Sequence, residues 1–263
     1  MQLDKITIET RVRSAWSAID LGICLARRFW LRSVLLYLTL AIPVFGLILL
    51  ASPSPESLWP YFILWWFKPI FERPILHMMS RELFSEPMSY RKVINEFWLW
   101  IKPAFFWVTT WRRLSIYRGM SAPIMLLEQP KGGDYSKRAS VLVSKSSSEA
   151  LWLTVVFYHI EQFLFVALLA LIAMFFPTWI MDNWGSVSGD HYIAAITNGT
   201  MLIFMALIAP FYVAGGFMLY ICRRIELEGW DIEIVFRNWM SNFKAPIDAR
   251  VSMEDAHIKV EQS

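Results

Sequence analysis

The chain has 263 residues, of which 56% are hydrophobic, and it contains 14 Trp and 19 Phe. This apolar share exceeds that of ordinary globular domains and argues against a soluble protein. The net charge is only +3, from 25 Lys and Arg against 22 Asp and Glu, so the positions of the charges are more informative than their sum.

Lys and Arg are missing from two long stretches, Ser33–Phe67 and Ser146–Cys222, where apolar residues concentrate. Hydrocarbon excludes cations, and external loops between spans carry few of them. We therefore expect an all-α polytopic integral membrane protein. It should have about four transmembrane helices, re-entrant or interfacial amphipathic helices on the cytoplasmic side, and both termini in the cytoplasm.

The same topology accounts for the basic clusters, so no nucleic-acid partner is expected. The expected partners are the lipid bilayer itself and anionic lipids at its cytoplasmic face, which attract basic groups near the surface.

Residues 1–32 are predicted to form an amphipathic cytoplasmic or interfacial helix. From Thr10 to Arg32 apolar residues recur at helical spacings among five arginines. Such a helix is expected to lie in the membrane interface before the chain turns inward.

Residues 33–71 are predicted to form the first transmembrane hairpin. Ser33–Ala51 is apolar and just long enough to cross a core of ~30 Å. The return span from Leu58 crosses only if it continues through Lys68, whose ammonium group would reach the cytoplasmic interface.

That return helix is expected to end or bend near Pro69 or Pro74, because proline removes a helical hydrogen bond. Ile75–Phe84 would then lie along the cytoplasmic surface.

Residues 72–148 are predicted to form a cytoplasmic and membrane-dipping segment. Phe97–Trp111 is apolar but short, with Lys102-Pro103 in its middle, which favours a re-entrant segment over a span. Whether it crosses stays open at this point. A basic surface helix is expected from Tyr135.

Residues 149–222 are predicted to form a second transmembrane hairpin, with spans at Glu149–Phe176 and Tyr192–Tyr220. Residues 223–263 are expected to form a cytoplasmic C-terminal helix and tail, with the helix at Ile225–Met240.

Glu161 lies inside the third predicted span, where an ionised carboxylate is costly unless it is paired. It either fixes helix packing or belongs to an intramembrane polar site. The predicted partners lie on the fourth span: Thr197, Asn198 and Thr200. His159 is a further candidate, but it stands roughly 200° around the helix from Glu161.

A second group of charges follows the last span and is a candidate docking surface for a cytoplasmic partner. Arg223 with Glu226, and Arg224 with Glu228, meet at helical spacings and should pair. The alternative is a stop-transfer boundary with a solvated face. The candidate surface comprises Arg223, Arg224, Glu226, Glu228, Asp231 and Glu233.

No catalytic constellation stands out. The four histidines are scattered without metal-ligand spacing, and no phosphate-binding loop or nucleophile motif occurs. We therefore expect no metal, no cofactor and no enzymatic activity, although a membrane-embedded carboxylate reaction is left open.

Three blocks carry a resemblance: Trp65–Arg73 with Leu76–Phe84, Thr110–Leu114, and Pro210–Gly216 continuing to Arg237. Together they resemble an uncharacterised family of proteobacterial polytopic inner-membrane proteins, whose members tend to be encoded near MoxR-type AAA+ ATPases. The region Leu127–Leu142 is also similar to the membrane domain of glycerophosphodiester phosphodiesterases. Both resemblances imply location and architecture, and neither implies functional residues.

The sequence favours a non-enzymatic scaffold or accessory subunit that docks partner proteins at the cytoplasmic face, or that forms a homo-oligomer. The alternative is a transporter or lipid-handling protein that uses an intramembrane polar pocket around Glu161.

Overall fold

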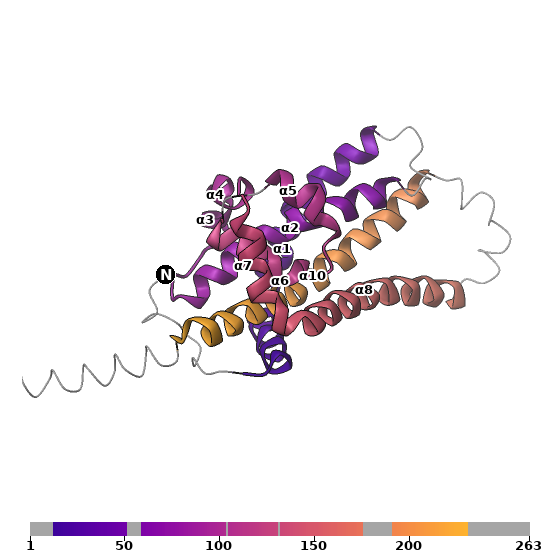
Figure 1. Cartoon of the computed structure of the whole chain (residues 1–263). Helices are drawn as coiled ribbons and strands as arrows, with labels where there is room; N and C mark the ends of the chain where they lie inside the picture. Colours follow the sequence, from indigo (N-terminus) through magenta and orange to yellow (C-terminus); the bar gives the residue numbers. More distant parts are fainter. Residues whose placement is uncertain (1–12, 52–58, 104, 131, 176–190, 231–263) are drawn as a thin grey trace, which may run out of the picture.

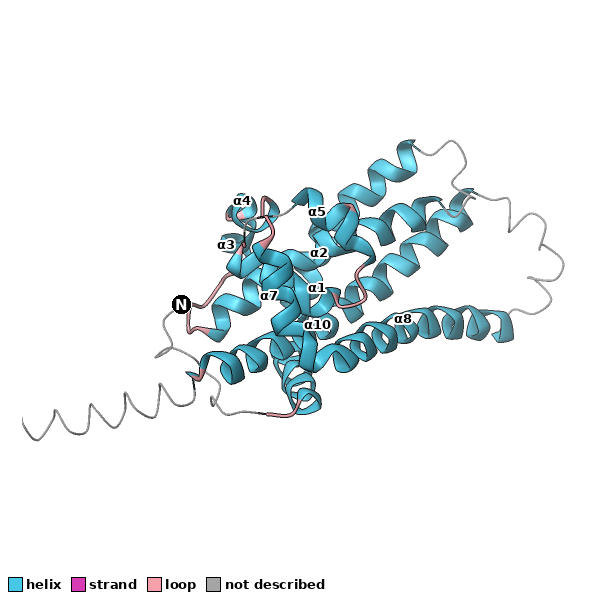
Figure 2. Cartoon of the chain, viewed as in Figure 1, coloured by secondary structure: helices cyan, strands magenta, loops and turns pink. Residues whose placement is uncertain are grey.

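The computed structural model describes residues 13–51, 59–103, 105–130, 132–175 and 191–230 (Figure 1). Within these residues the secondary structure is helical and contains no strand (Figure 2), which confirms the predicted all-α class. The connections inside the two predicted hairpins, residues 52–58 and 176–190, and the tail from residue 231 lie outside the described residues.

Four long helices make up the body of the described chain: α1 (Ala15–Ala51), α2 (Trp59–Leu83), α8 (Ser147–Phe175) and α10 (His191–Glu228). Between α2 and α8 the chain forms short helices. These are α3 (Tyr90–Asn95), α4 (Phe97–Ile101), α5 (Phe105–Thr109), η2 (Trp111–Leu114), α6 (Arg118–Pro123), η3 (Ile124–Glu128), α7 (Asp134–Val143) and η4 (Ser144–Ser146). Helix α7 confirms the helix predicted from Tyr135.

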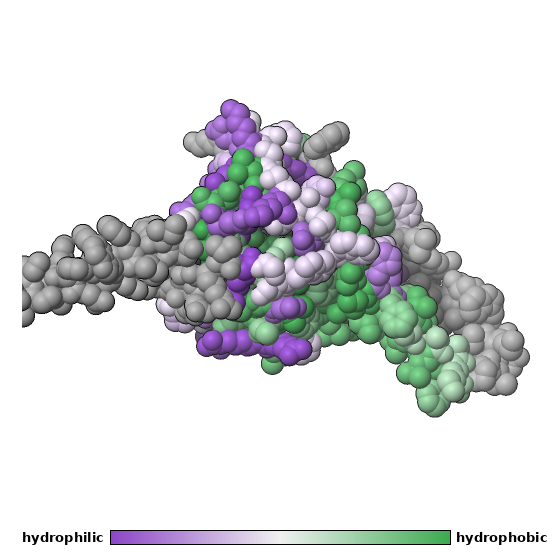
Figure 3. Space-filling model, turned by 60° about the horizontal axis from the view of Figure 1, so that its bottom comes forward, coloured by the Kyte–Doolittle hydropathy of each residue, from purple (hydrophilic) through white to green (hydrophobic). Residues whose placement is uncertain are grey.

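Three helical segments of the described chain are long and apolar enough to cross a membrane: α1, Asp134–Phe175 and Ala195–Glu228. This is the pattern of a multi-pass membrane protein. Helix α2 is not among them, since its second half carries several charges. Hydrophobic residues cover the right part of the molecule in Figure 3, and hydrophilic residues gather on the left.

Helix α1 corrects the prediction of a separate interfacial helix. The chain runs unbroken from Ala15 to Ala51, about 55 Å at ~1.5 Å per residue, with no glycine or proline where the turn was expected. Its first half packs against α10 rather than lying free at an interface.

Helix α10 is the central element and contacts α1, α2, α6 and α8 (Figure 1). Every residue from Tyr212 to Cys222 is buried, because other helices surround this part of α10 on all sides. Gly229 follows with φ of 64°, a left-handed conformation that ends helices. A separate helix was predicted to begin at Ile225. The residues Ile225–Glu228 instead form the last turn of α10.

Glycines permit the close approach of α10 to its neighbours. A Cβ atom on Gly22 of α1 would lie 2.6 Å from the Ala214 carbonyl oxygen, and one on Gly216 would overlap the carbonyl oxygen of Gly119 in α6. Small residues at such crossings let two backbones touch, which is the principal source of helix association in a membrane.

The segment Phe97–Trp111 is divided around Pro103 into α4 and α5, each of five residues. Neither is long enough to cross a bilayer. Both short helices pack against α2.

We expect Gly22→Ala to destabilise the protein by about 1–3 kcal/mol, because the added methyl group has to displace the backbone of α10. Gly46→Ala in the same helix is the matched control, since a Cβ there meets nothing within 4 Å. Thermal unfolding in detergent measures both. Equal melting temperatures for the two variants would contradict the close packing of α1 on α10.

Candidate functional site

A lysine and a glutamate are buried against each other between α2 and α8. The Lys68 ammonium group donates to Oε2 of Glu161, and the side chains are 8% and 1% exposed. Lys68 was predicted to reach the cytoplasmic interface. That prediction is wrong, because the carboxylate inside the protein offers it a charged partner.

The predicted partners of Glu161 on the fourth span are also wrong. Thr200 donates to the carbonyl oxygen of Ile196, and no hydrogen bond joins Glu161 to Thr197, Asn198 or Thr200 in the described chain. Glu161 turns toward α2 instead of α10.

A second side-chain contact joins α8 to α2 directly beside the ion pair. Nε2 of Gln162 donates to the Tyr61 hydroxyl at 3.1 Å. His159 is exposed and bonds to the carbonyl oxygen of Val155 at 2.7 Å. The prediction that His159 and Glu161 occupy different faces of the helix is therefore confirmed.

Helix α2 stays helical through Pro69 and Pro74, so the break predicted there is wrong. Most of its second half is buried, which corrects the predicted surface helix Ile75–Phe84. Pro69 has no N–H for the Trp65 carbonyl, which would be costly if left unpaired away from water. Arg113 supplies the missing donors: its Nη2 bonds to Trp65 O at 2.5 Å and its Nε to Trp66 O at 3.0 Å.

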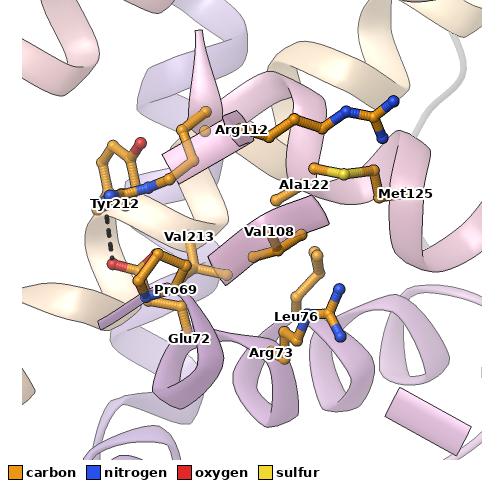
Figure 4. A pocket seen from close by; sticks show the side chains of 12 residues that line it. Pro69, Glu72, Arg73, Leu76, Val108, Arg112, Ala122, Met125, Tyr212 and Val213 are labelled. Atoms are coloured by element: carbon orange, nitrogen blue, oxygen red, sulfur yellow. Dashed lines mark hydrogen bonds and ion pairs between the residues drawn. The ribbon is translucent and has the colours of Figure 1, made fainter. Parts of the chain in front are cut away.

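A second buried ion pair lies one turn further along α2. Nη2 of Arg118 is 3.5 Å from Oε1 of Glu72, the pair drawn as a dashed line in Figure 4. The two side chains border a cavity of about 30 Å³, and Figure 4 shows Arg73 and Arg112 on its other sides. A space of this size suits ordered water rather than a larger ligand.

A larger pocket of about 320 Å³ lies on the α8 side of the same residues. We call it the cationic pocket. It lies between α2, α8, α10 and the turn that follows η2, and three cations and four aromatic side chains are prominent in its lining: Lys68, Arg113, Arg118, Trp65, Phe157, Tyr158 and Tyr212. Arg118 and Tyr212 line both cavities.

Polar atoms around the cationic pocket lack partners. Oε1 of Glu161, Nε of Arg118 and the Tyr37 hydroxyl are buried and make no hydrogen bond in the described part of the chain. Ser33 Oγ and Arg223 Nε are likewise buried without a partner in the described residues, so such atoms are not confined to one region. Most buried polar atoms in folded proteins are paired, and among these five residues Arg118 is the one that lines the cationic pocket.

The predicted docking charges behave differently, because the protein pairs them internally. Arg223 and Arg224 bond to Glu226 and Glu228 at 2.6 Å each, as their spacing predicts. Lys145 pairs with Glu226 as well. Asp231 and Glu233 lie outside the described residues.

This charge network extends to η3 and α7. Arg138 forms a two-bond contact with Glu128, at 2.7 and 3.0 Å, and reaches Glu228 at 2.5 Å. The Tyr220 hydroxyl donates to Glu128 at 2.7 Å. Burial alone would raise the pKa of Glu128, but the hydrogen bonds from Arg138 and Tyr220 hold it below its usual value. The network thus fastens the end of α10 to the short helices.

The described residues contain no group of three or more His, Cys, Asp or Glu side chains that could hold a metal ion. No protein-family model matches this sequence, and no curated protein or solved structure shows significant similarity to it. The resemblances drawn from sequence blocks therefore stay predictions, and the function has to be argued from the site.

Sequence reasoning found Glu161 but missed Lys68 as its partner and Arg113 as a donor to the carbonyls of α2. A signal for Lys68 was present, since opposite charges in two adjacent apolar segments are expected to pair. No comparable signal pointed to Arg113, whose carbonyl partners lie 47 and 48 residues earlier in the chain.

We expect Lys68→Met and Glu161→Gln each to destabilise the protein by about 3–5 kcal/mol, because each leaves a buried charge unpaired. The double variant Lys68→Met/Glu161→Gln should recover most of that loss, because it leaves no buried charge at either position. Unfolding in detergent gives the coupling energy between the two positions. Additive effects of the single changes would show that the ion pair does not form.

The lowered pKa of Glu128 predicts a pH dependence of stability. Its contribution is complete above about pH 4.5 and declines as the pH falls through the lower pKa of the folded state. The difference in melting temperature between the wild type and Glu128→Gln should therefore shrink as the pH is lowered from about 7 to about 4. A constant difference over that range would contradict the network.

Proposed function

We propose that this protein is a membrane-embedded binding protein that holds a small amphipathic molecule, such as a lipid, in the cationic pocket. The observation that carries the proposal is the pocket of about 320 Å³ beside the buried Lys68–Glu161 pair. Binding, rather than catalysis, is proposed as the role of this site.

The energetics of the site support this proposal. Ions removed from water cost several kcal/mol each, and well-packed apolar side chains commonly give equal or greater stability. Charged residues within membrane segments are rare and commonly mark binding sites, pathways or relays. The charges around the cationic pocket therefore favour a role in binding a ligand.

Access from the bilayer supports the same proposal. Ala150, Leu153 and Glu161 are the buried residues of α8, and none is buried between Glu161 and Phe175. Helix α8 approaches α2 through long side chains, including Lys68–Glu161 and Tyr61–Gln162. We propose that an acyl chain enters the pocket between these loosely joined helices.

The rival proposal is a scaffold that docks partner proteins through charges at the end of α10. Those charges are engaged in ion pairs with Lys145, Arg138 and Glu128, or with one another. Internal pairing reduces the charge available to a partner, so the binding proposal has the stronger support.

We further propose that α2 completes a fourth crossing, in a bacterial inner membrane, with both termini in the cytoplasm. Its first half is apolar, and Lys68, Glu72 and Arg73 are buried in the protein, whereas Arg81 near the end of the helix is exposed. Reporter fusions within residues 177–191 test this orientation, and a cytoplasmic reporter signal there would refute it.

We expect Ile208→Trp to abolish the retention of a bound amphiphile, because the larger side chain fills the cationic pocket. Ile203→Trp is the matched control: it lies in the same helix, is 51% exposed and does not line the pocket. Native mass spectrometry after extraction in a neutral detergent measures retained lipid. No retained lipid in the wild type, or equal retention in both variants, would refute the proposal.

A further inference from the structure

The cationic pocket contains a buried guanidinium group that has no acidic partner. Arg113 is 4% exposed, and no carboxylate in the described chain lies within ion-pair distance of it. Its Nε and Nη2 bond to backbone carbonyls, which carry no full charge, and its Nη1 has no hydrogen bond there. An uncompensated buried charge is costly, and a bound anion is the direct way to compensate it.

Two further cations lie in the same pocket. Lys68 comes from α2 and Arg118 from α6, so three segments that are separate in sequence direct their charges to one place. Glu161 and Glu72 compensate Lys68 and Arg118, which leaves the charge of Arg113 in excess. No carboxylate is among the lining residues.

Arg118 retains hydrogen-bonding capacity as well as charge. Its Nη2 makes a long contact of 3.5 Å with Glu72, and its Nε is buried without an acceptor in the described residues. Guanidinium groups bind phosphate and carboxylate oxygens through paired N–H donors. The donors of Arg113 and Arg118 therefore fit an oxyanion better than a neutral headgroup.

Much of the remaining lining of the pocket is apolar, although Ser115, Thr154 and His159 also belong to it. Trp65, Phe157 and Ile208 line it, and the guanidinium carbon of Arg113 lies 3.9 Å from the centre of the Trp65 ring. A fully hydrophilic anion would leave these walls without contacts, and a cation would be repelled by the lining charges. A molecule with an anionic headgroup and a hydrocarbon chain can contact both the cations and the apolar walls of the pocket.

We propose that the cationic pocket selects an anionic amphiphile, with a phosphate or carboxylate headgroup held by Arg113, Arg118 and Lys68. The hydrocarbon chain lies along Trp65 and Phe157 and leaves toward the exposed side of α8. This inference rests on the proposed function and adds the chemical class of the ligand.

Three probes on the purified full-length protein separate the possibilities: dodecyl phosphate, dodecylphosphocholine and inorganic phosphate. The first two share a chain and differ in headgroup charge, and the third is the anion without a chain. Binding is measured in a neutral maltoside detergent. We expect dodecyl phosphate to bind at least roughly tenfold more tightly than either of the other two.

Arg113→Gln should remove most of this preference, because it deletes the charge and keeps a donor for the α2 carbonyls. Arg112→Gln is the matched control, with the same loss of charge at a neighbour that does not line the cationic pocket but stacks over the Tyr135 ring. It should leave the preference unchanged. If Arg113→Gln does not fold, the three probes on the wild type and on Ile208→Trp decide the matter.

The possible outcomes distinguish the two proposals. Equal binding of both dodecyl probes, lost in Ile208→Trp, would refute the preference for anions and leave the proposed function intact. Inorganic phosphate binding as tightly as dodecyl phosphate would identify a site for free oxyanions and refute the amphiphile. Binding that high salt abolishes and that neither Ile208→Trp nor Arg113→Gln changes would place the probe on the exposed basic surface, and both proposals would fail.

Discussion

The buried pair of Lys68 and Glu161 is the contact on which the shape of the site depends. Few residues of α8 are buried, and Glu161 is the last buried one along the helix. The pair therefore holds α8 at a distance from α2 set by two long side chains. Shorter apolar residues at both positions would let the helices close and fill the cationic pocket.

The short helices after α2 make the continuity of that helix possible. Pro69 deprives a carbonyl of its donor, and Arg113 returns two donors from a distant part of the chain. In the opposite direction, Arg73 of α2 donates to the carbonyl oxygens of Trp100 and Ile101 at the end of α4. Each segment thus satisfies backbone groups of the other, so α2 and the short helices stabilise one another. Arg113 therefore has two roles. Its guanidinium group donates hydrogen bonds to carbonyls of α2, and its positive charge belongs to the lining of the cationic pocket.

Local patterns in the sequence predicted the features that depend on local chemistry. The helical class, the pairs formed by Arg223 and Arg224, and the burial of Glu161 all follow from composition and spacing. The predictions failed where a distant side chain replaces a missing local bond. Pro69 leaves the Trp65 carbonyl without its helical donor, and the guanidinium group of Arg113 supplies one.

The interface helix predicted before Ser33 failed for a related reason. Its amphipathic pattern is real, but α10 rather than lipid headgroups covers its apolar face. A periodic pattern specifies that one face is buried without specifying what covers it. The close contact of Gly22 with α10 could not be predicted from either helix alone.

The two groups of charges in this protein differ in how completely they are paired. At the end of α10, Arg138 and Arg224 share Glu128 and Glu228, an arrangement that fastens helices together. Around the cationic pocket, no carboxylate of the described chain lies within ion-pair distance of Arg113. Burial makes such an unpaired charge far more costly there. If both groups of charges served only stability, the more buried group would be the more completely paired. This difference in pairing is the reason for proposing a bound anion in the cationic pocket.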